Sequence, residues 1–251
     1  MRLLFNTKQE LITKLNNGIS INQISKELSL AKSTIYYYYK KINGQKYQPP
    51  RYEILFSEQE GEIVGIFAGD GSQYYSKKDG SYRTKIHFGN VPLYANYVKN
   101  LYEFYFNKKV NINFSKRNQF TIKMSNKEMF DFYKIYLDYN SNHKHDTVKL
   151  KTFDLPPKFI IGFLRGLLDT DGCICLSKHQ LRIIYTTTSK ELANQIKKLL
   201  QNWDIDSNIQ INLRKGYKAL YIIQIRSKSF DTFLKIIKPF KAKKFGLVAQ
   251  W

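Results

Sequence analysis

The stretch Gly61-Glu-Ile-Val-Gly-Ile-Phe-Ala-Gly-Asp-Gly71 decides the fold of this chain, because its pattern returns as Gly162-Phe-Leu-Arg-Gly-Leu-Leu-Asp-Thr-Asp-Gly172. Both stretches are mostly apolar, carry glycines four residues apart and end in Asp-Gly. Residues four apart lie on one face of a helix, so the glycines form a smooth stripe on each predicted helix. Two stripes that face each other let two helix backbones pack in close contact.

Two helices packed in this way would end together and bring Asp70 and Asp171 side by side. Carboxylates held close together away from water repel each other unless a cation lies between them. Ligand sets made only of oxygen favour Mg²⁺. The two stretches therefore predict a divalent metal site at the ends of the paired helices.

The segments that follow the two motifs show the same order of elements. Each motif precedes two alternating strands (71–77 and 82–88; 172–178 and 181–187), a helix (92–106; 190–202), two more strands (109–115 and 119–124; 207–214 and 218–226) and a last helix (127–138; 227–237). We therefore expect an α+β fold of two pseudo-symmetric αββαββα repeats, 59–150 and 151–251.

The first 46 residues are expected to form a separate all-α domain. Short helices are predicted over 9–15, from Ser20 onward and over 32–41, with a tight turn before the last one, which is the helix-turn-helix pattern. Segment 47–58 is predicted to be a linker, because no helix or central strand crosses its two adjacent prolines.

The run 18–36 resembles the DNA-binding module of resolvases and invertases, through Gly18, the small Ser25 and the Ser33-Thr-Ile-Tyr36 opening of the last helix. The outward face of that helix can reach phosphates and base edges in a major groove. The residues expected on this face are Lys32, Ser33, Tyr36, Tyr37 and Lys40.

The charge balance favours a nucleic acid as partner. The chain has 41 Lys and Arg against 20 Asp and Glu, a formal net charge of +21, and 15% of its residues are aromatic. Its hydrophobic share of 43% excludes global disorder, and no apolar run is long enough for a membrane span.

Two observations predict an intracellular protein (cytoplasm, nucleoid or organelle matrix) that is not secreted. The N-terminus has no apolar segment of the length that a secretory signal needs. The only cysteines, Cys173 and Cys175, are expected to point to opposite faces of an extended segment, which argues against a disulfide and for a reducing compartment.

The stretches 63–71 and 164–172 resemble the two name-giving motifs of the LAGLIDADG homing endonucleases, and the likeness extends over about 190 of the 251 residues. The resemblance implies that each repeat adds a four-stranded antiparallel sheet to a DNA-binding saddle. It also implies that Asp70 and Asp171 bind divalent metal, helped by the carbonyls of Gly69 and Thr170.

The function implied by this resemblance is that of a monomeric Mg²⁺-dependent endonuclease, with Mn²⁺ or Ca²⁺ as other cations for the site. Each centre would cut one strand, giving a double-strand break in a long asymmetric target, usually an intron-insertion site. A lysine near the end of each repeat often assists the reaction in the family, and the candidates here are Lys149 and Lys244.

The motifs also depart from the family pattern at two positions. Ala68 replaces the first Asp of the motif, which the second repeat keeps as Asp169. Arg165 stands where a small or apolar residue is usual, so it either faces the edge of its own repeat or loosens the helix pair.

Polar side chains on the strands are expected to contact the DNA. Arg and Lys can read guanine, and Gln can read adenine. Gln73 is a candidate both for base reading and for holding a water molecule. The candidates are Gln73, Tyr75, Lys77, Arg83, Lys85, Lys116, Arg117 and Lys123 in the first repeat, and Lys178, Arg182, Arg214, Lys215, Gln224 and Arg226 in the second.

The sequence leaves two other functions open. A transcription regulator could use the same scaffold without cutting, and the helix-turn-helix pattern favours this, although both motif aspartates are retained. An RNA maturase that helps its host intron to splice would also use a basic saddle, since such a surface suits A-form RNA. The partners to test are therefore double-stranded DNA first and intron RNA second.

Overall fold

The computed structural model describes residues 4–17, 19–43, 53–77, 80–115, 118–177 and 180–245. The chain divides into two compact units, Met1–Arg51 and Tyr52–Trp251. Each unit has its own hydrophobic core. The candidate lysines and arginine at positions 116, 117 and 178 lie outside the described residues.

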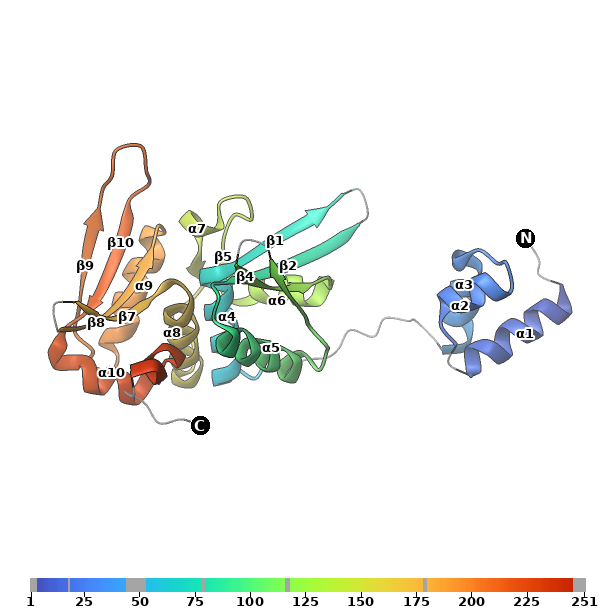
Figure 1. The fold of residues 1–251 in the computed structure, drawn as a ribbon, viewed down its shortest axis with the longest axis horizontal. Coiled ribbons are helices and arrows are strands. Elements are labelled where there is room, and N and C mark those ends of the chain that lie inside the picture. The colour runs from blue at the N-terminus through green and yellow to red at the C-terminus, as the bar shows by residue number, and fades with distance from the viewer. Residues whose placement is uncertain are drawn as a thin grey trace. The chain divides into compact units, whose positions relative to one another are not determined.

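The first unit consists of three helices, α1 (Phe5–Asn16), α2 (Ile21–Glu27) and α3 (Lys32–Asn43) (Figure 1). Its core is formed by Leu11, Leu15, Ile24 and Ile35. The side chain of Ser20 accepts a hydrogen bond from the backbone of Gln23 and so caps α2, as expected. Three short helices are therefore present in this unit, and their function as a DNA-binding module stays a prediction.

The second unit contains two repeats of the same element order. The first comprises α4 (Glu58–Asp70), β1 (Gly71–Ser76), β2 (Ser81–Phe88), α5 (Pro92–Phe106), β3 (Asn111–Ser115), β4 (Gln119–Met124) and α6 (Lys127–Tyr136). The second comprises α8 (Pro157–Asp171), β7 (Cys173–Ser177), β8 (Gln180–Thr187), α9 (Lys190–Gln201), β9 (Ser207–Asn212), β10 (Leu220–Ile225) and α10 (Phe230–Ile237). The predicted α+β fold with two αββαββα repeats is confirmed.

Short elements join and close the repeats. The connection between them holds β5 (Leu137–Asp138), the helical turn α7 (Lys144–Thr147) and β6 (Lys149–Leu150). A 3₁₀ turn, η1 (Ser227–Ser229), precedes α10, and a second one, η2 (Phe240–Phe245), follows it. The sites described below depend on α7 and η2, which the sequence did not predict.

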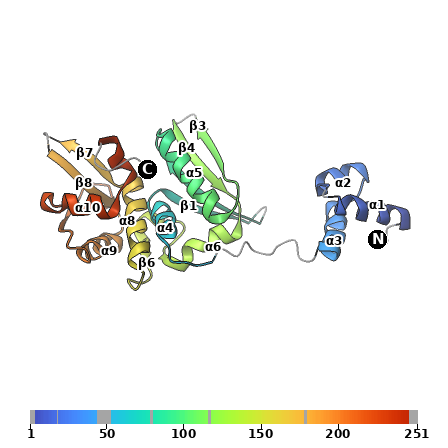
Figure 2. The same cartoon turned by 90° about the horizontal axis from the view of Figure 1, so that it is seen from below.

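Each repeat has one antiparallel sheet with a buried face and a polar face. The strand orders are β1-β2-β4-β3 and β7-β8-β10-β9. Ile86 and Ile122 are fully buried in the first sheet, as are Ile183 and Ile223 in the second. Helices α5 and α6 pack on the buried face of one sheet and α9 on that of the other (Figure 2), where Phe233 of α10 also contacts Tyr185 of β8. Alternate side chains therefore point from each sheet toward solvent.

Helices α4 and α8 lie side by side between the two sheets, in backbone contact (Figures 1 and 2). A Cβ atom added at Gly65 would lie 2.1 Å from the carbonyl oxygen of Phe163. One added at Gly162 would lie 1.9 Å from the carbonyl oxygen of Glu58. The glycine stripes are therefore required by the close approach of the two helices.

Arg165 fastens the helix pair instead of loosening it. Its Nη1 donates to the Glu62 carboxylate at 3.2 Å, its Nη2 bonds Glu58, and its Nε donates to the Ile237 carbonyl at 2.7 Å. Glu62 is buried, and it also accepts a hydrogen bond from the Tyr97 hydroxyl at 2.7 Å. One guanidinium thus joins α8 to α4 and α10, which explains why a charged residue is tolerated at this position.

We expect the Gly65→Ala variant to lose about 3 kcal/mol or more of unfolding free energy, because its Cβ meets backbone atoms that cannot rotate away. Urea unfolding followed by circular dichroism measures the change. Gly89→Ala is the matched control, since a Cβ there has no neighbour within 4 Å. A Gly65→Ala variant as stable as the control would contradict the backbone contact.

Candidate active site at the ends of the paired helices

Asp70 and Asp171 are the last residues of α4 and α8. A Cβ added at Gly69 would lie 3.3 Å from the Asp171 carboxyl carbon, so the two helix ends meet at these residues. Burial, followed by the neighbouring charge of Asp171, raises the pKa of Asp70 to about 7. Burial also raises the pKa of Asp171. The negative end of each helix dipole further destabilises the ionised form of both carboxylates. A neighbouring positive charge would stabilise the pair.

Two lysines provide positive charge at the same place. Lys144, on α7, donates from Nζ to the carbonyls of Phe67, Ala68 and Gly69 at 2.8, 2.6 and 2.8 Å. Its Nζ therefore caps the last turn of α4. Burial lowers the pKa of Lys144 to about 8, although Asp171 and Asp70 oppose this shift.

Lys241, in η2, holds the corresponding place at the end of α8. Its Nζ donates to the carbonyls of Leu168, Thr170 and Gly172 at 3.2, 3.1 and 2.5 Å. Burial lowers the pKa of Lys241 as well. The site thus combines two aspartates and two lysines, one of each from each repeat.

The second repeat holds its lysine with an extra carboxylate. Asp169 is buried and accepts hydrogen bonds from the backbone N–H groups of Phe240 and Lys241 at 2.8 and 2.9 Å. Burial raises the pKa of Asp169 to about 7. The first repeat has Ala68 at this position, so Lys144 is held by α7 without such a carboxylate. The first Asp of the motif therefore fixes the backbone that carries Lys241.

The donor set at the helix ends fits a hard divalent cation. In the described part of the chain, no group of three or more His, Cys, Asp or Glu side chains could hold a metal ion. Two carboxylates with waters and substrate phosphates are a sufficient ligand set for Mg²⁺. The Gly69 and Thr170 carbonyls each accept a lysine hydrogen bond, and each keeps a second lone pair for a further interaction.

The two lysines named from the sequence are not the ones found at the helix ends. Lys149 lies on β6, with its Nζ 3.8 Å from the Asp138 carboxylate. The side chain of Lys244 lies outside the described residues. Several lysines follow the last helix of each repeat, and sequence spacing alone could not select Lys144 and Lys241 among them.

Most of the described strand candidates lie on or beside the polar faces. Arg83, Lys85 and Lys123 share the polar face of the first sheet, and Arg182 and Gln224 share that of the second. The other exposed candidates stand in turns or next to strand ends: Lys77, Arg214, Lys215 and Arg226.

Gln73 and Tyr75 are corrections to the predicted DNA-facing set. Strand β1 begins at Gly71, so its odd-numbered residues pair with Ile86, Thr84 and Tyr82 on the helix-covered face. Gln73 is buried there, donates to the Phe130 carbonyl at 2.7 Å and accepts a bond from Tyr139. Its side chain is thus used for packing the repeat and not for reading bases or holding a catalytic water.

The expected arrangement of the cysteines is also wrong. Cys173 and Cys175 are two residues apart in β7, and such residues share a face of the sheet. Both are free thiols. Burial and the hydrogen-bonded Cys175 raise the pKa of Cys173.

The predicted contact residues of the first unit lie on α3. Lys32, Ser33, Tyr37 and Lys40 are exposed, and Tyr36 is partly exposed. The Lys40 Nζ stands 5.2 Å from the centre of the Tyr36 ring. Basic and aromatic groups thus alternate on this face.

Comparison with known proteins gives one family match and several relatives. Residues 158–238 match the model of the LAGLIDADG-like domain. An uncharacterized protein of Methanocaldococcus jannaschii is 27% identical over 200 residues, which are 78% of this chain and 68% of that protein.

No helix among the described residues is long and apolar enough to cross a membrane.

Solved structures share the fold. The homing endonuclease I-DmoI in complex with DNA and Ca aligns with a TM-score of 0.59 at 17% identity, over 76% of this chain and 98% of that chain. I-DmoI has also been solved with DNA and Mn, and a variant of it with its target DNA and Mg. The N-terminal LAGLIDADG domain of WhiA aligns with a TM-score of 0.52 at 16% identity, over 78% of this chain and 91% of that chain.

In metal-free buffer we expect the Asp70 carboxylate to destabilise the fold increasingly as pH rises. The unfolded group ionises near pH 4 and the folded group near pH 7, so stability is lost between these values and the loss is complete above them. Asp70→Asn should therefore be more stable than the wild type at pH 8 in EDTA, by on the order of 2–4 kcal/mol. The difference should vanish toward pH 4.

Urea unfolding at several pH values tests this expectation. The control is Asp154→Asn, which removes an exposed carboxylate in the loop before α8. Equal pH dependence of the wild type and both variants would show that the Asp70 carboxylate is not held in a partly desolvated, repulsive site.

Proposed function

We propose, from the LAGLIDADG-like domain that this chain carries, that it is a site-specific DNA endonuclease that uses a divalent cation to make double-strand breaks. The observation that carries the proposal is the meeting of Asp70 and Asp171 at the ends of two glycine-packed helices, each capped by a lysine. A packed helix pair needs no half-buried carboxylates at its end for its own stability, and the raised pKa values of Asp70 and Asp171 indicate a cost to the fold.

The cation would lie between the two aspartates. Asp70 and Asp171 would supply its charged ligands, and the carbonyls of Gly69 and Thr170, the residues that precede them, would be further oxygen ligands. When bound, such an ion stabilises the negative charge that develops on the attacked phosphate. Mg²⁺ suits this ligand set, and Mn²⁺ and Ca²⁺ are the other ions to test.

We assign to Lys144 and Lys241 the transfer of protons from the attacking water and to the leaving group. Each ammonium is fixed by three backbone carbonyls, so its position does not depend on the DNA. Lys144, with a pKa of about 8, can release one of its three carbonyl-bound protons near neutral pH, and the freed lone pair can then take a proton from water. With one lysine for each repeat, each strand would have its own proton carrier.

The polar faces of the two sheets would bind the duplex on both sides of this centre. Because both repeats belong to one chain, a monomer supplies two different half-sites, and the target is long and asymmetric. The three-helix unit would add contacts through α3. An enzyme of this kind acts inside the cell that contains its target, and intron homing is the process that such cutting serves.

A non-cleaving DNA-binding protein is the second candidate. The observation in its favour is the additional three-helix unit, together with the fold shared with the LAGLIDADG domain of WhiA. The aspartate and lysine of each repeat argue against it, because binding alone requires neither. A maturase that binds intron RNA would be tested only if duplex DNA is not bound.

The experiment is a selection from randomised long duplexes, with Mg²⁺ or with EDTA, followed by sequencing of the cut ends. We expect ends at one long asymmetric site, dependent on Mg²⁺ and absent for Asp70→Asn/Asp171→Asn, because that variant lacks both charged ligands. Sequence enrichment through binding without cut ends would favour the non-cleaving protein. Identical ends from the double variant would show that another centre cuts.

A second experiment distinguishes the lysines. We expect Lys144→Met and Lys241→Met each to slow the cutting of one strand by about 100-fold or more, so that nicked plasmid accumulates. Lys149→Met should cut within about twofold of wild type, since its Nζ faces Asp138. Slow cutting by Lys149→Met, with normal cutting by the other two variants, would contradict this assignment and support Lys149, the lysine predicted from the sequence.

A further inference from the structure

The two polar sheet faces have the same geometry but different side chains. In the first sheet, Ser72 is the first outward residue after Asp70, and the ladder continues through Lys85 and Lys123 to Asn111. We call these four residues the first inner row. They are the first row after Asp70 that crosses all four strands, and His87, Thr121 and Asn113 lie one row nearer to Asp70 on the same face.

The corresponding row of the second sheet begins at Cys173, the first outward strand residue after Asp171. The ladder continues through Ile184 and Gln224 to Asn208, and these four residues are the second inner row. Strand order and distance from the motif aspartate therefore match Lys85 with Ile184, and Lys123 with Gln224.

The first inner row concentrates positive charge. Lys85 and Lys123 stand directly opposite each other on neighbouring strands, an arrangement that destabilises a sheet unless an anion is bound. Burial and the charges of these two lysines lower the pKa of the adjacent His87. Lysine at a base edge donates to the O6 and N7 acceptors of guanine.

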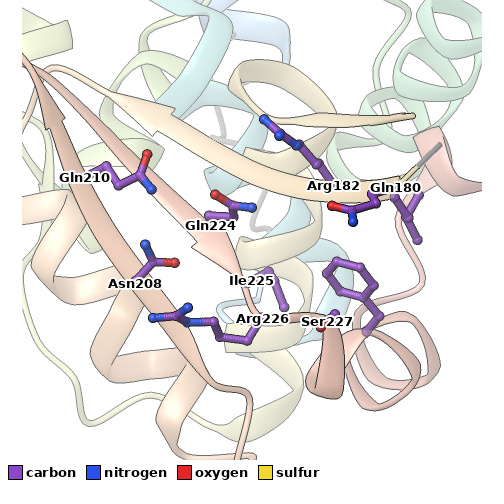
Figure 3. Close-up of a pocket in the computed structure, with 10 residues that line it drawn as sticks. Gln180, Arg182, Asn208, Gln210, Gln224, Ile225, Arg226 and Ser227 are labelled. Atoms are coloured by element: carbon purple, nitrogen blue, oxygen red, sulfur yellow. The ribbon is translucent and has the colours of Figure 1, made fainter. Parts of the chain in front are cut away.

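The second inner row contains no charged side chain. Gln224 and Asn208 line an open hollow of about 470 Å³ on the polar face, together with Gln210 of the neighbouring row (Figure 3). An amide side chain can bond the N6 and N7 atoms of adenine in a bidentate manner, and Ile184 offers an apolar contact for a thymine methyl group.

The next row outward is similar in both sheets. Arg83 pairs with Tyr74 in the first sheet, and Arg182 pairs with Cys175 in the second. Arg226 follows β10 and lines the same hollow as Arg182 (Figure 3). Neighbouring rows are two residues apart along a strand, about 6.7 Å, which corresponds to about two base pairs.

We propose that the two inner rows make the target asymmetric: Lys85 and Lys123 select G·C pairs in one half-site, whereas Ile184, Gln224 and Asn208 select A·T pairs at the matching position of the other. The arginines of the next row select guanine in both halves, about two base pairs further out. This inference rests on the proposed function and specifies the DNA that the site takes.

The test is a reciprocal exchange of inner-row residues in the full chain. Ile184→Lys/Gln224→Lys gives the second row the two lysines of the first, and Lys85→Ile/Lys123→Gln makes the opposite change. Each variant, checked for folding by thermal melting, is used to select 30-base-pair randomised duplexes by binding in Ca²⁺ and by cutting in Mg²⁺. Gln201→Ala, an exposed amide at the end of α9, is the control.

We expect each exchange to change the base preference by at least about tenfold at its own inner position and at no other position. An unchanged inner preference, or a loss of affinity spread evenly over all sequences, would overturn the inference, since even loss indicates phosphate contacts. A wild-type protein that enriches no duplex in either selection would instead overturn the proposed function, and the inference with it.

Discussion

The contact between the backbones of α4 and α8 is the constraint on which the rest of the structure depends. Where Gly65 meets the Phe163 carbonyl, no side chain fits between the helices. This contact fixes the distance between the two sheets and makes the two helices end together. The carboxylates at their ends are consequently brought together in a half-buried place, where their charges oppose folding unless other groups compensate.

The lysines that offset the repulsion between the two aspartates lie on segments outside the regular αββαββα order. Helical turn α7 brings Lys144 to the end of α4, and η2 brings Lys241 to the end of α8. The two arrangements are not equivalent, because Asp169 holds the η2 backbone whereas Ala68 gives α7 no such support. The pseudo-symmetric fold thus builds the two halves of one site differently. An asymmetric DNA target would require a similar difference between the two sheets.

The sequence predicted the features that depend on spacing. Glycines four residues apart indicated the helix contact, and the repeated order of elements gave both sheets and the α+β class. Prediction from the sequence failed where the position of a side chain depends on strand register or on a contact between distant segments. The predicted start of β1 at Gly71 is correct, but the pairing of Gln73 with buried Thr84 puts its side chain on the face that the helices cover, opposite to the prediction. Lys144 and Lys149 both follow the last helix of the first repeat, so the sequence does not distinguish them. Only the fold shows that Lys144 reaches the end of α4.

The central claim is that the ends of α4 and α8 form a single metal-dependent site for cutting DNA. The most direct measurement is an anomalous difference map from crystals of the chain with its selected duplex and Mn²⁺. We predict a peak between the Asp70 and Asp171 carboxylates, beside a phosphate of the duplex and within reach of Lys144 and Lys241. Bound duplex without a metal peak between these carboxylates would contradict the account.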